Sequence, residues 1–146
     1  MDTLRYKVDR ATANKISCFT RHTAEYSGYH KSTSWEDTIT ANAGETTFYD
    51  SVTGKPLFIA PKGRTLTEFI DETKKSGWPS FREEELVTEN VVELPNGEMV
   101  SSDGTHLGHN LPGMAGYAAG NRYCINLSSI SGNPKWNATD SKLENE

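Results

Sequence analysis

Cysteine is scarce in this chain of 146 residues, as are the features that mark several protein classes. The only cysteines are Cys18 and Cys124, too few for a disulfide scaffold or a four-cysteine zinc site. No apolar run approaches the roughly 18 residues that suggest a membrane span, and residues 1–10 lack the apolar segment of a signal peptide. We therefore expect a cytoplasmic protein with no membrane partner, in which each cysteine is either buried or a reactive thiol.

The sequence has no stripe of basic residues. The chain has 15 Lys and Arg against 20 Asp and Glu, which gives a net charge of −5 at pH 7. This mild negative charge favours solubility and argues against a nucleic-acid partner, because binding to a phosphate backbone depends on clustered cations. The aromatic and aliphatic residues suffice for a single core, so we expect one globular domain.

Residue patterns predict a mainly β fold of two antiparallel sheets, packed face to face or as a partly closed barrel, with one or two short helices. Short strands are predicted at residues 46–49 and 56–59. A hairpin is predicted around the Asn-Gly pair at positions 96 and 97. Residues 122–130 alternate apolar and polar side chains like a half-buried strand, which places Cys124 on the polar side.

One helix is predicted at residues 65–75, with Thr65 and Glu68 at capping-box spacing and Gly77 as its stop. Residues 31–44 are rich in Ser, Thr, Asn and Gly, which predicts a loop. We expect the chain to divide into three parts, listed here in order: an N-terminal segment packed on the domain (1–45), the domain core (46–131) and a C-terminal tail (132–146).

Cys124 is the first candidate for chemistry. Arg122, Cys124 and Asn126 share one face of the predicted strand. A neighbouring Arg stabilises the thiolate, which is the reactive form of cysteine. The Asn126 amide can donate a hydrogen bond to a substrate oxygen. The alternative is a structural cysteine at a sheet surface.

Two histidines form the second candidate cluster. His106 and His109 are three residues apart and bracketed by glycines, so both imidazoles can point into one cleft and serve in acid/base chemistry. A metal site with Asp103 as third ligand is an alternative, although Gly104 and Gly108 disfavour the helix that would align the three side chains. Surface histidines without a function are the second alternative.

Residues 77–81, Gly-Trp-Pro-Ser-Phe, are the third cluster. The proline holds Trp78 in an extended conformation. Trp78 and Phe81 can therefore wall an apolar pocket. Ordinary packing of both rings in the core is the alternative.

Four motifs in this order resemble the B-type methionine sulfoxide reductases, the SelR family. They lie at residues 56–58, 77–81, 106–109 and 122–126, and a weaker similarity extends to residues 23–28. The resemblance implies a SelR-like (MSS4-like) fold and reduction of the R epimer of methionine sulfoxide, either free or in oxidised proteins.

The resemblance also implies roles for individual residues. Cys124 would attack the sulfoxide sulfur and become a sulfenic acid, while Trp78, Phe81 and Arg122 would bind the substrate. The proton donors and oxygen-binding groups would be His106, His109 and Asn126. A sulfoxide oxygen is a poor leaving group until it is protonated, so these residue types suit the chemistry.

The sequence departs from the family at several positions. Many members bind structural zinc through two cysteine pairs, but the corresponding positions hold no thiolate, so we expect no metal; these positions are Asp50, Thr53, Val100 and Asp103. The family's usual resolving cysteine, two residues before the Trp, is replaced by Ser76.

The thiol of Cys124 would have to be regenerated without any bound cofactor. Cys18 would either form a disulfide with Cys124 that thioredoxin opens, or an external thiol would act on Cys124 directly. Two other functions compete with the reductase: a Cys/His acyl-transfer enzyme, and a binding module that keeps the scaffold without turnover.

Overall fold

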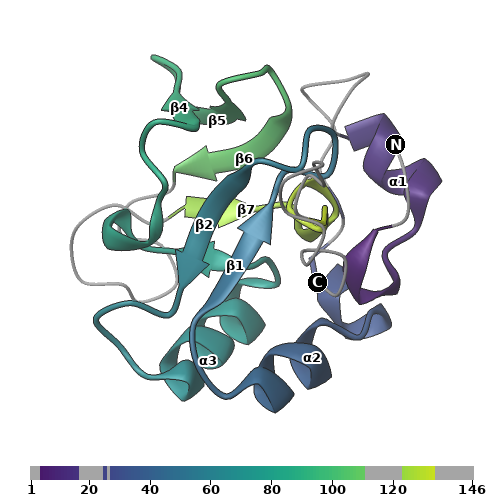
Figure 1. The fold of residues 1–146 in the computed structure, drawn as a ribbon, viewed down its shortest axis with the longest axis vertical. Helices are drawn as coiled ribbons and strands as arrows, with labels where there is room; N and C mark the ends of the chain where they lie inside the picture. Colours follow the sequence, from purple (N-terminus) through teal and green to yellow (C-terminus); the bar gives the residue numbers. More distant parts are fainter. Residues whose placement is uncertain (1–3, 17–24, 26, 111–122, 134–146) are drawn as a thin grey trace, which may run out of the picture.

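The computed structural model describes residues 4–16, 25, 27–110 and 123–133. These residues form seven strands and three α-helices, together with short 3-10 turns. The strands build two antiparallel sheets, one of two strands and one of five, and no closed barrel forms in the described part (Figure 1). The mainly β, two-sheet fold predicted from the sequence is confirmed, with three helices instead of one or two.

The small sheet pairs β1 (Thr46–Tyr49) with β2 (Pro56–Ala60), and Phe48 lies opposite Phe58. The turn between the two strands is held by Asp50. Its carboxylate accepts hydrogen bonds from the Val52 amide at 2.8 Å and from the Thr105 hydroxyl at 2.9 Å. Asp50 therefore fixes its own turn and ties that turn to the other sheet.

The large sheet has the strand order β3-β7-β6-β5-β4. Its strands are β3 (Ser80–Phe81), β4 (Val91–Glu93), β5 (Glu98–Ser101), β6 (His106–Asn110) and β7 (Tyr123–Ile125). The predicted hairpin is confirmed as β4–β5, whose turn includes Gly97 at a positive φ of 87°. The hairpin lies at the opposite end of the molecule from the helices α2 and α3 (Figure 1).

Strand β7 is shorter than the sequence predicted. It ends at Ile125 and is followed by a 3-10 turn, η6 (Leu127–Ser129). The expected alternation of buried and exposed residues was also wrong, because all of residues 123–130 are buried. Polar groups in this buried segment are accommodated by hydrogen bonds: the Ser128 hydroxyl donates to Glu25, and the Ser129 carbonyl accepts from the Ser51 amide.

Helix α3 (Leu66–Ser76) starts and ends one residue later than the predicted 65–75, and its predicted cap at Thr65 and stop at Gly77 are confirmed. The Glu68 amide donates to the Thr65 hydroxyl at 3.1 Å, and the Thr65 amide donates to the Glu68 carboxylate at 2.7 Å. Gly77 closes the helix in the left-handed region at φ 92°. A side chain at Gly77 would also overlap Ser27, so glycine is required there on both grounds.

Helix α2 (Trp35–Asn42) occupies the segment predicted to be a loop. Only two of its side chains, Trp35 and Ile39, are buried, and they lie one turn apart. Because the other residues of this helix are not buried, its sequence shows no helical repeat of apolar residues. The Trp35 ring packs edge-on against Phe69 of α3, with ring centroids 5.8 Å apart. Helix α2 is therefore stabilised by tertiary packing and not by the helix propensity of its residues.

The polar N-terminal segment also contributes to the core. It contains η1 (Arg5–Lys7), α1 (Arg10–Asn14) and η3 (Tyr29–Ser32). Side chains from this segment join the same buried cluster as those of the sheets, namely Leu4, Tyr6, Val8, Ala13 and Tyr29. No helix in the described part of the chain has both the length and the apolar character to cross a bilayer.

Aromatic rings fill the space between the small sheet, α3 and β3. Phe58 stacks on Phe81 with centroids 4.3 Å apart, and Phe48 and Phe69 lie 5.4 and 5.5 Å from Phe81. All four rings are fully buried. This cluster packs against the face of the large sheet that bears Phe81.

A buried charge network fastens β3 to α3. The Arg64 side chain, only 1% exposed, donates to both carboxylate oxygens of Glu85 in η4 (Glu83–Glu85), at 2.7 and 3.0 Å. It also donates to Glu72 at 2.8 Å and to the Ser80 carbonyl at 2.8 Å. Charges buried this deeply are tolerated only when they are paired and hydrogen-bonded, so the network fixes the position of β3.

Candidate active site

The register of the large sheet places Cys124 in a row of facing residues. Cys124 lies opposite Ser80 on one side and His109 on the other, and His109 lies opposite Glu98. Facing residues of antiparallel strands project to the same side of a sheet. A thiol, an imidazole, a carboxylate and a hydroxyl therefore share one face, opposite to the face that bears Phe81. Of these four residues only His109 is exposed; Cys124, Glu98 and Ser80 are buried.

His106 joins this face because of an irregularity in the pairing of β5 with β6. Residues three apart in a regular strand point to opposite faces, but the register shifts between Met99 and Val100, so an extra residue of β6 is accommodated. The His106 ring consequently lies 6.0 Å from the His109 ring, and its Nδ1 lies 3.2 Å from a carboxylate oxygen of Glu98. His106 is buried and His109 is exposed.

Gly108 allows β6 to approach β7 closely. A Cβ atom at this position would overlap the backbone carbonyl of Cys124 and crowd the Cα of Ile125. The glycine between the two histidines is therefore required by backbone packing, and that packing brings His109 beside Cys124.

Asn126 follows directly after β7, and hydrogen bonds hold both its backbone and its side chain. Its amide donates to the Leu107 carbonyl at 2.7 Å, and its side-chain oxygen accepts from the Glu25 amide at 3.2 Å. Its side-chain nitrogen is buried and meets no acceptor among the described residues. A buried donor of this kind is suited to a substrate oxygen, since it is costly to leave unpaired.

The Trp78 side chain is half-buried and anchored by its ring nitrogen, which donates to the Glu25 carbonyl at 3.0 Å. Glu25 thus bonds Trp78 through its carbonyl and Asn126 through its amide. Two residues that are far apart in the sequence are thus both tied to the backbone of Glu25.

Three predicted site residues are not found beside Cys124 in the described part of the structure. Phe81 is fully buried and stacks on Phe58, on the opposite face of β3 from Ser80, so the structure places it in the core rather than beside Cys124. The alternation of side chains along a strand accounts for this difference. Cys18 and Arg122 lie outside the described residues.

Glu25 is a site residue that the sequence patterns did not single out. Its carboxylate accepts hydrogen bonds from the Leu127 amide at 2.9 Å and from the amide and hydroxyl of Ser128 at 3.0 and 3.1 Å. Burial raises the pKa of this carboxyl from its ordinary 4.5 to about 7, and the bonds from Ser128 and Leu127 only partly oppose the rise. Its sole sequence signal is its place within the weak upstream similarity at residues 23–28.

Ser76 lies next to the row that contains Cys124. Its hydroxyl is 3.0 Å from that of Ser80, which faces Cys124 across the sheet. The same hydroxyl lies 2.9 Å from the Trp78 carbonyl. Ser76 is therefore in contact with the residue that pairs with Cys124.

The alternative metal triad of Asp103, His106 and His109 is not assembled. Asp103 forms an ion pair with Lys55 at 3.1 Å, whereas His106 lies against Glu98. Within the described ranges, no three His, Cys, Asp or Glu side chains are grouped as metal ligands would be.

No protein-family model matches this chain, and no curated protein matches it. The functional interpretation therefore depends on the motifs and on the geometry described above.

Proposed function

We propose that this protein reduces methionine R-sulfoxide to methionine with Cys124 as the nucleophile. The observation that carries the proposal is the sheet register that sets Cys124 directly opposite His109, on the face opposite to the one that bears Phe81. Asn126 adds a buried amide nitrogen that meets no acceptor in the described part. A thiol, a proton donor and an oxygen-binding group are the three parts that the reaction requires.

The reaction balances with these groups. The Cys124 thiolate attacks the sulfoxide sulfur, and an imidazolium of the histidine pair protonates the sulfoxide oxygen, which also accepts the Asn126 amide hydrogen. The attack forms a bond between the Cys124 sulfur and the substrate sulfur. The protonated oxygen then moves to the Cys124 sulfur while the substrate's sulfur–oxygen bond and the new sulfur–sulfur bond break, so methionine leaves and Cys124 becomes a sulfenic acid. The substrate sulfur gains two electrons, and the cysteine sulfur loses two.

Trp78 supplies the apolar contact for the substrate methyl group. The indole is fixed by its hydrogen bond to Glu25, so its ring face is held without mobility of the side chain. A methyl group offers nothing to hydrogen-bond, and one such contact contributes about 1–3 kcal/mol to selectivity. This contact favours the epimer whose methyl lies against the ring when its oxygen lies at Asn126.

Two equivalents of thiol return Cys124 to its reduced state. The first thiol condenses with the sulfenic acid, which releases water and leaves a disulfide; the second opens that disulfide. Thioredoxin or a small thiol can supply both, and a cytoplasmic location provides these reductants. Direct regeneration and a route through Cys18 are distinguished by mass spectrometry after one sulfoxide equivalent: a peptide linking Cys18 to Cys124 supports the second route.

A dithiothreitol-driven assay on the separated R and S epimers tests the proposal. The wild type should reduce the R epimer, and Cys124→Ser should be inactive. Cys18→Ser is the matched control and should keep its dithiothreitol-driven activity, because the small thiol replaces any resolving cysteine.

The assay has two outcomes that would refute the proposal: reductase activity in Cys124→Ser, or no reduction of either epimer by the wild type. Ester or amide hydrolysis without a reductant would instead support the acyl-transfer alternative. Saturable binding of a sulfoxide peptide without turnover would support the binding module.

A further inference from the structure

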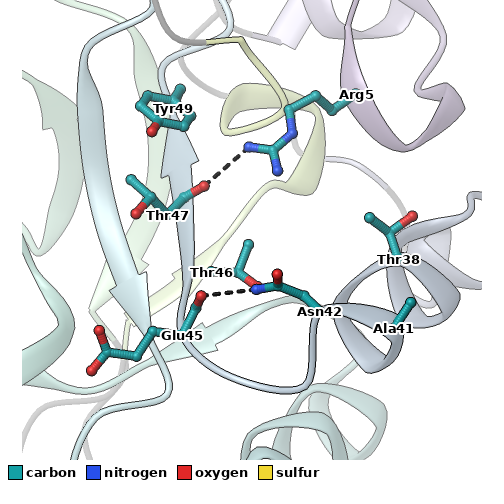
Figure 2. Close-up of a pocket in the computed structure, with 8 residues that line it drawn as sticks. All are labelled: Arg5, Thr38, Ala41, Asn42, Glu45, Thr46, Thr47 and Tyr49. Atoms are coloured by element: carbon teal, nitrogen blue, oxygen red, sulfur yellow. Dashed lines mark hydrogen bonds between the residues drawn. The ribbon is translucent and has the colours of Figure 1, made fainter. Parts of the chain in front are cut away.

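A polar pocket of about 480 Å³ lies away from the row that contains Cys124, between β1, α2 and η1 (Figure 2). Arg5 comes from η1, Asn42 from the end of α2, and Thr47 and Tyr49 from β1. None of the residues in the proposed reaction lines it. The pocket is large enough for a small organic molecule.

The Arg5 guanidinium is held in place but keeps most of its hydrogen-bonding capacity. It donates one hydrogen bond, to the Thr47 carbonyl at 3.1 Å, and its central carbon lies 5.1 Å from the Tyr6 ring centre and 5.8 Å from that of Tyr49. Contacts with two rings restrict the plane of the guanidinium. Its remaining donors are available to a ligand.

Arg5 forms no ion pair with an acidic side chain among the described residues. Ion pairs with carboxylates are formed by Lys55, Arg64, Lys74 and Arg82. The chain as a whole has a net charge of −5. An arginine left without a carboxylate in an acidic protein is suited to an anion from outside.

The backbone next to Arg5 is strained. Tyr6 and Lys7 both have positive φ angles, 61° and 58°, in the left-handed region that non-glycine residues rarely adopt. Anchors hold the segment on both sides: the Arg5 amide donates to the Ser131 carbonyl at 2.7 Å, and the Ser34 amide donates to the Tyr6 carbonyl at 2.9 Å. Strain of this kind is retained where the surroundings enforce it, most often at binding sites.

Asn42 presents an acceptor on the other side of the pocket. Its side-chain nitrogen donates to the Glu45 carbonyl at 2.9 Å and to the Thr46 hydroxyl at 3.0 Å, which fixes the orientation of the amide. Its side-chain oxygen is on the side that faces Arg5 (Figure 2). The pocket therefore offers cationic donors at Arg5 and a neutral acceptor at Asn42. Glu45 also lines it, with its carboxylate turned away from Arg5 and Asn42 (Figure 2).

We infer that this pocket binds the carboxylate of an α-amino acid unit, with the carboxylate on Arg5 and the neighbouring N–H group donating to Asn42. The planar guanidinium of arginine can donate two parallel hydrogen bonds to the two oxygens of a carboxylate. The ammonium group of a lysine cannot form this paired arrangement. Two sources share this chemistry: a free amino acid and the C-terminal residue of a peptide. The site is separate from Cys124, so it does not depend on the proposed reductase activity.

Nitrogen-15 NMR titration of the full chain tests the inference with three probes: L-alanine, N-acetyl-L-alanine and L-alanine methyl ester. The first two should produce saturable shifts of the Thr47 and Tyr49 amides, whereas the ester, which lacks a carboxylate, should not. Tighter binding of L-alanine assigns the site to free amino acids, and tighter binding of the acetylated form assigns it to peptide termini.

Arg5→Met and Arg5→Lys should each weaken binding roughly tenfold or more, the value of a charge-assisted hydrogen bond. Lys7→Met is the matched control, because it removes an exposed cation two residues away that does not line the pocket. The Lys substitution keeps the positive charge. If the spectrum of the Met variant shows that it is unfolded, the affinity of the Lys variant still tests the inference. The inference is overturned by the absence of saturable shifts, by equal binding of the ester, or by unchanged affinity in the Arg5 variants.

Discussion

The buried carboxyl of Glu25 gives the protein a pH dependence opposite to that of a salt-bridged carboxylate. Its pKa is about 7 in the folded chain against an ordinary value of 4.5, because burial disfavours the charged form. The folded state therefore binds this proton more tightly than the unfolded state does. The contribution to stability is fully present below pH 4.5, falls as the pH rises to about 7, and then stays constant.

The size of this effect follows from the two pKa values. One pKa unit corresponds to about 1.4 kcal/mol, so a rise from 4.5 to about 7 corresponds to a loss of about 3 kcal/mol across that pH range. Glu25→Gln removes the ionisation and keeps the shape and one acceptor oxygen. The Gln nitrogen would face a backbone amide that in the wild type donates to a carboxylate oxygen of Glu25, so the variant should be less stable than the wild type near pH 5. Its free energy of unfolding should nevertheless fall much less than that of the wild type between pH 5 and pH 8.

Urea unfolding at pH 5, 6, 7 and 8 measures the difference between the two proteins, with Glu89→Gln, at an exposed position, as the control. The Glu25 carboxylate holds the turn after Asn126, and its backbone holds Trp78. Reductase turnover in the variant should therefore also lose part of its pH dependence between pH 5 and 8. A stability difference that stays constant over this range would refute the reasoning.

Three further predictions concern the supports of the site. Arg64→Met should lower the free energy of unfolding by about 3–5 kcal/mol, because it leaves a buried carboxylate unpaired; Arg82→Met, at a side chain 28% exposed, should cost less in the same urea experiment. Gly108→Ala should cost about 1–3 kcal/mol and lower kcat/KM by moving β6 from β7, and an unchanged kcat/KM would contradict this. Ser76→Cys should give a disulfide with Cys124 after one sulfoxide equivalent, detected as a linked peptide by mass spectrometry; only unlinked thiols would count against it.

Elements whose signals are local could be predicted from the sequence. Helix α3 has its capping box at Thr65 and its glycine stop at Gly77, and the β4–β5 hairpin has its turn residues in place. Helix α2 could not be predicted, because it is specified by two buried side chains, Trp35 and Ile39, that meet partners distant in the sequence. A polar helix with so small a buried face differs little from a loop in its local pattern.

The candidate site was only partly predictable for the same reason. The residue types at Cys124, His109 and Asn126 indicated thiol chemistry, but their alignment depends on strand register, which is set by pairing between distant segments. Glu25 lies 101 residues from Asn126 in the sequence, and no periodicity connects the two. Phe81 was misplaced because the rigid Trp-Pro turn suggested a pocket wall, whereas strand alternation turns that ring into the core.

Asp50 and Asp103, two of the positions at which the resemblance would place zinc-binding cysteines, form side-chain interactions in the structure. Where the resemblance would place metal-binding cysteines, Asp50 accepts a buried hydrogen bond from Thr105, and Lys55 forms an exposed ion pair with Asp103. The exposed pair contributes little, so the Asp50 bond is the main side-chain link between these two turns. Thr105 immediately precedes His106, so the position of the start of β6, and with it the approach of the histidines to Cys124, depends on the hydrogen bond between Thr105 and Asp50.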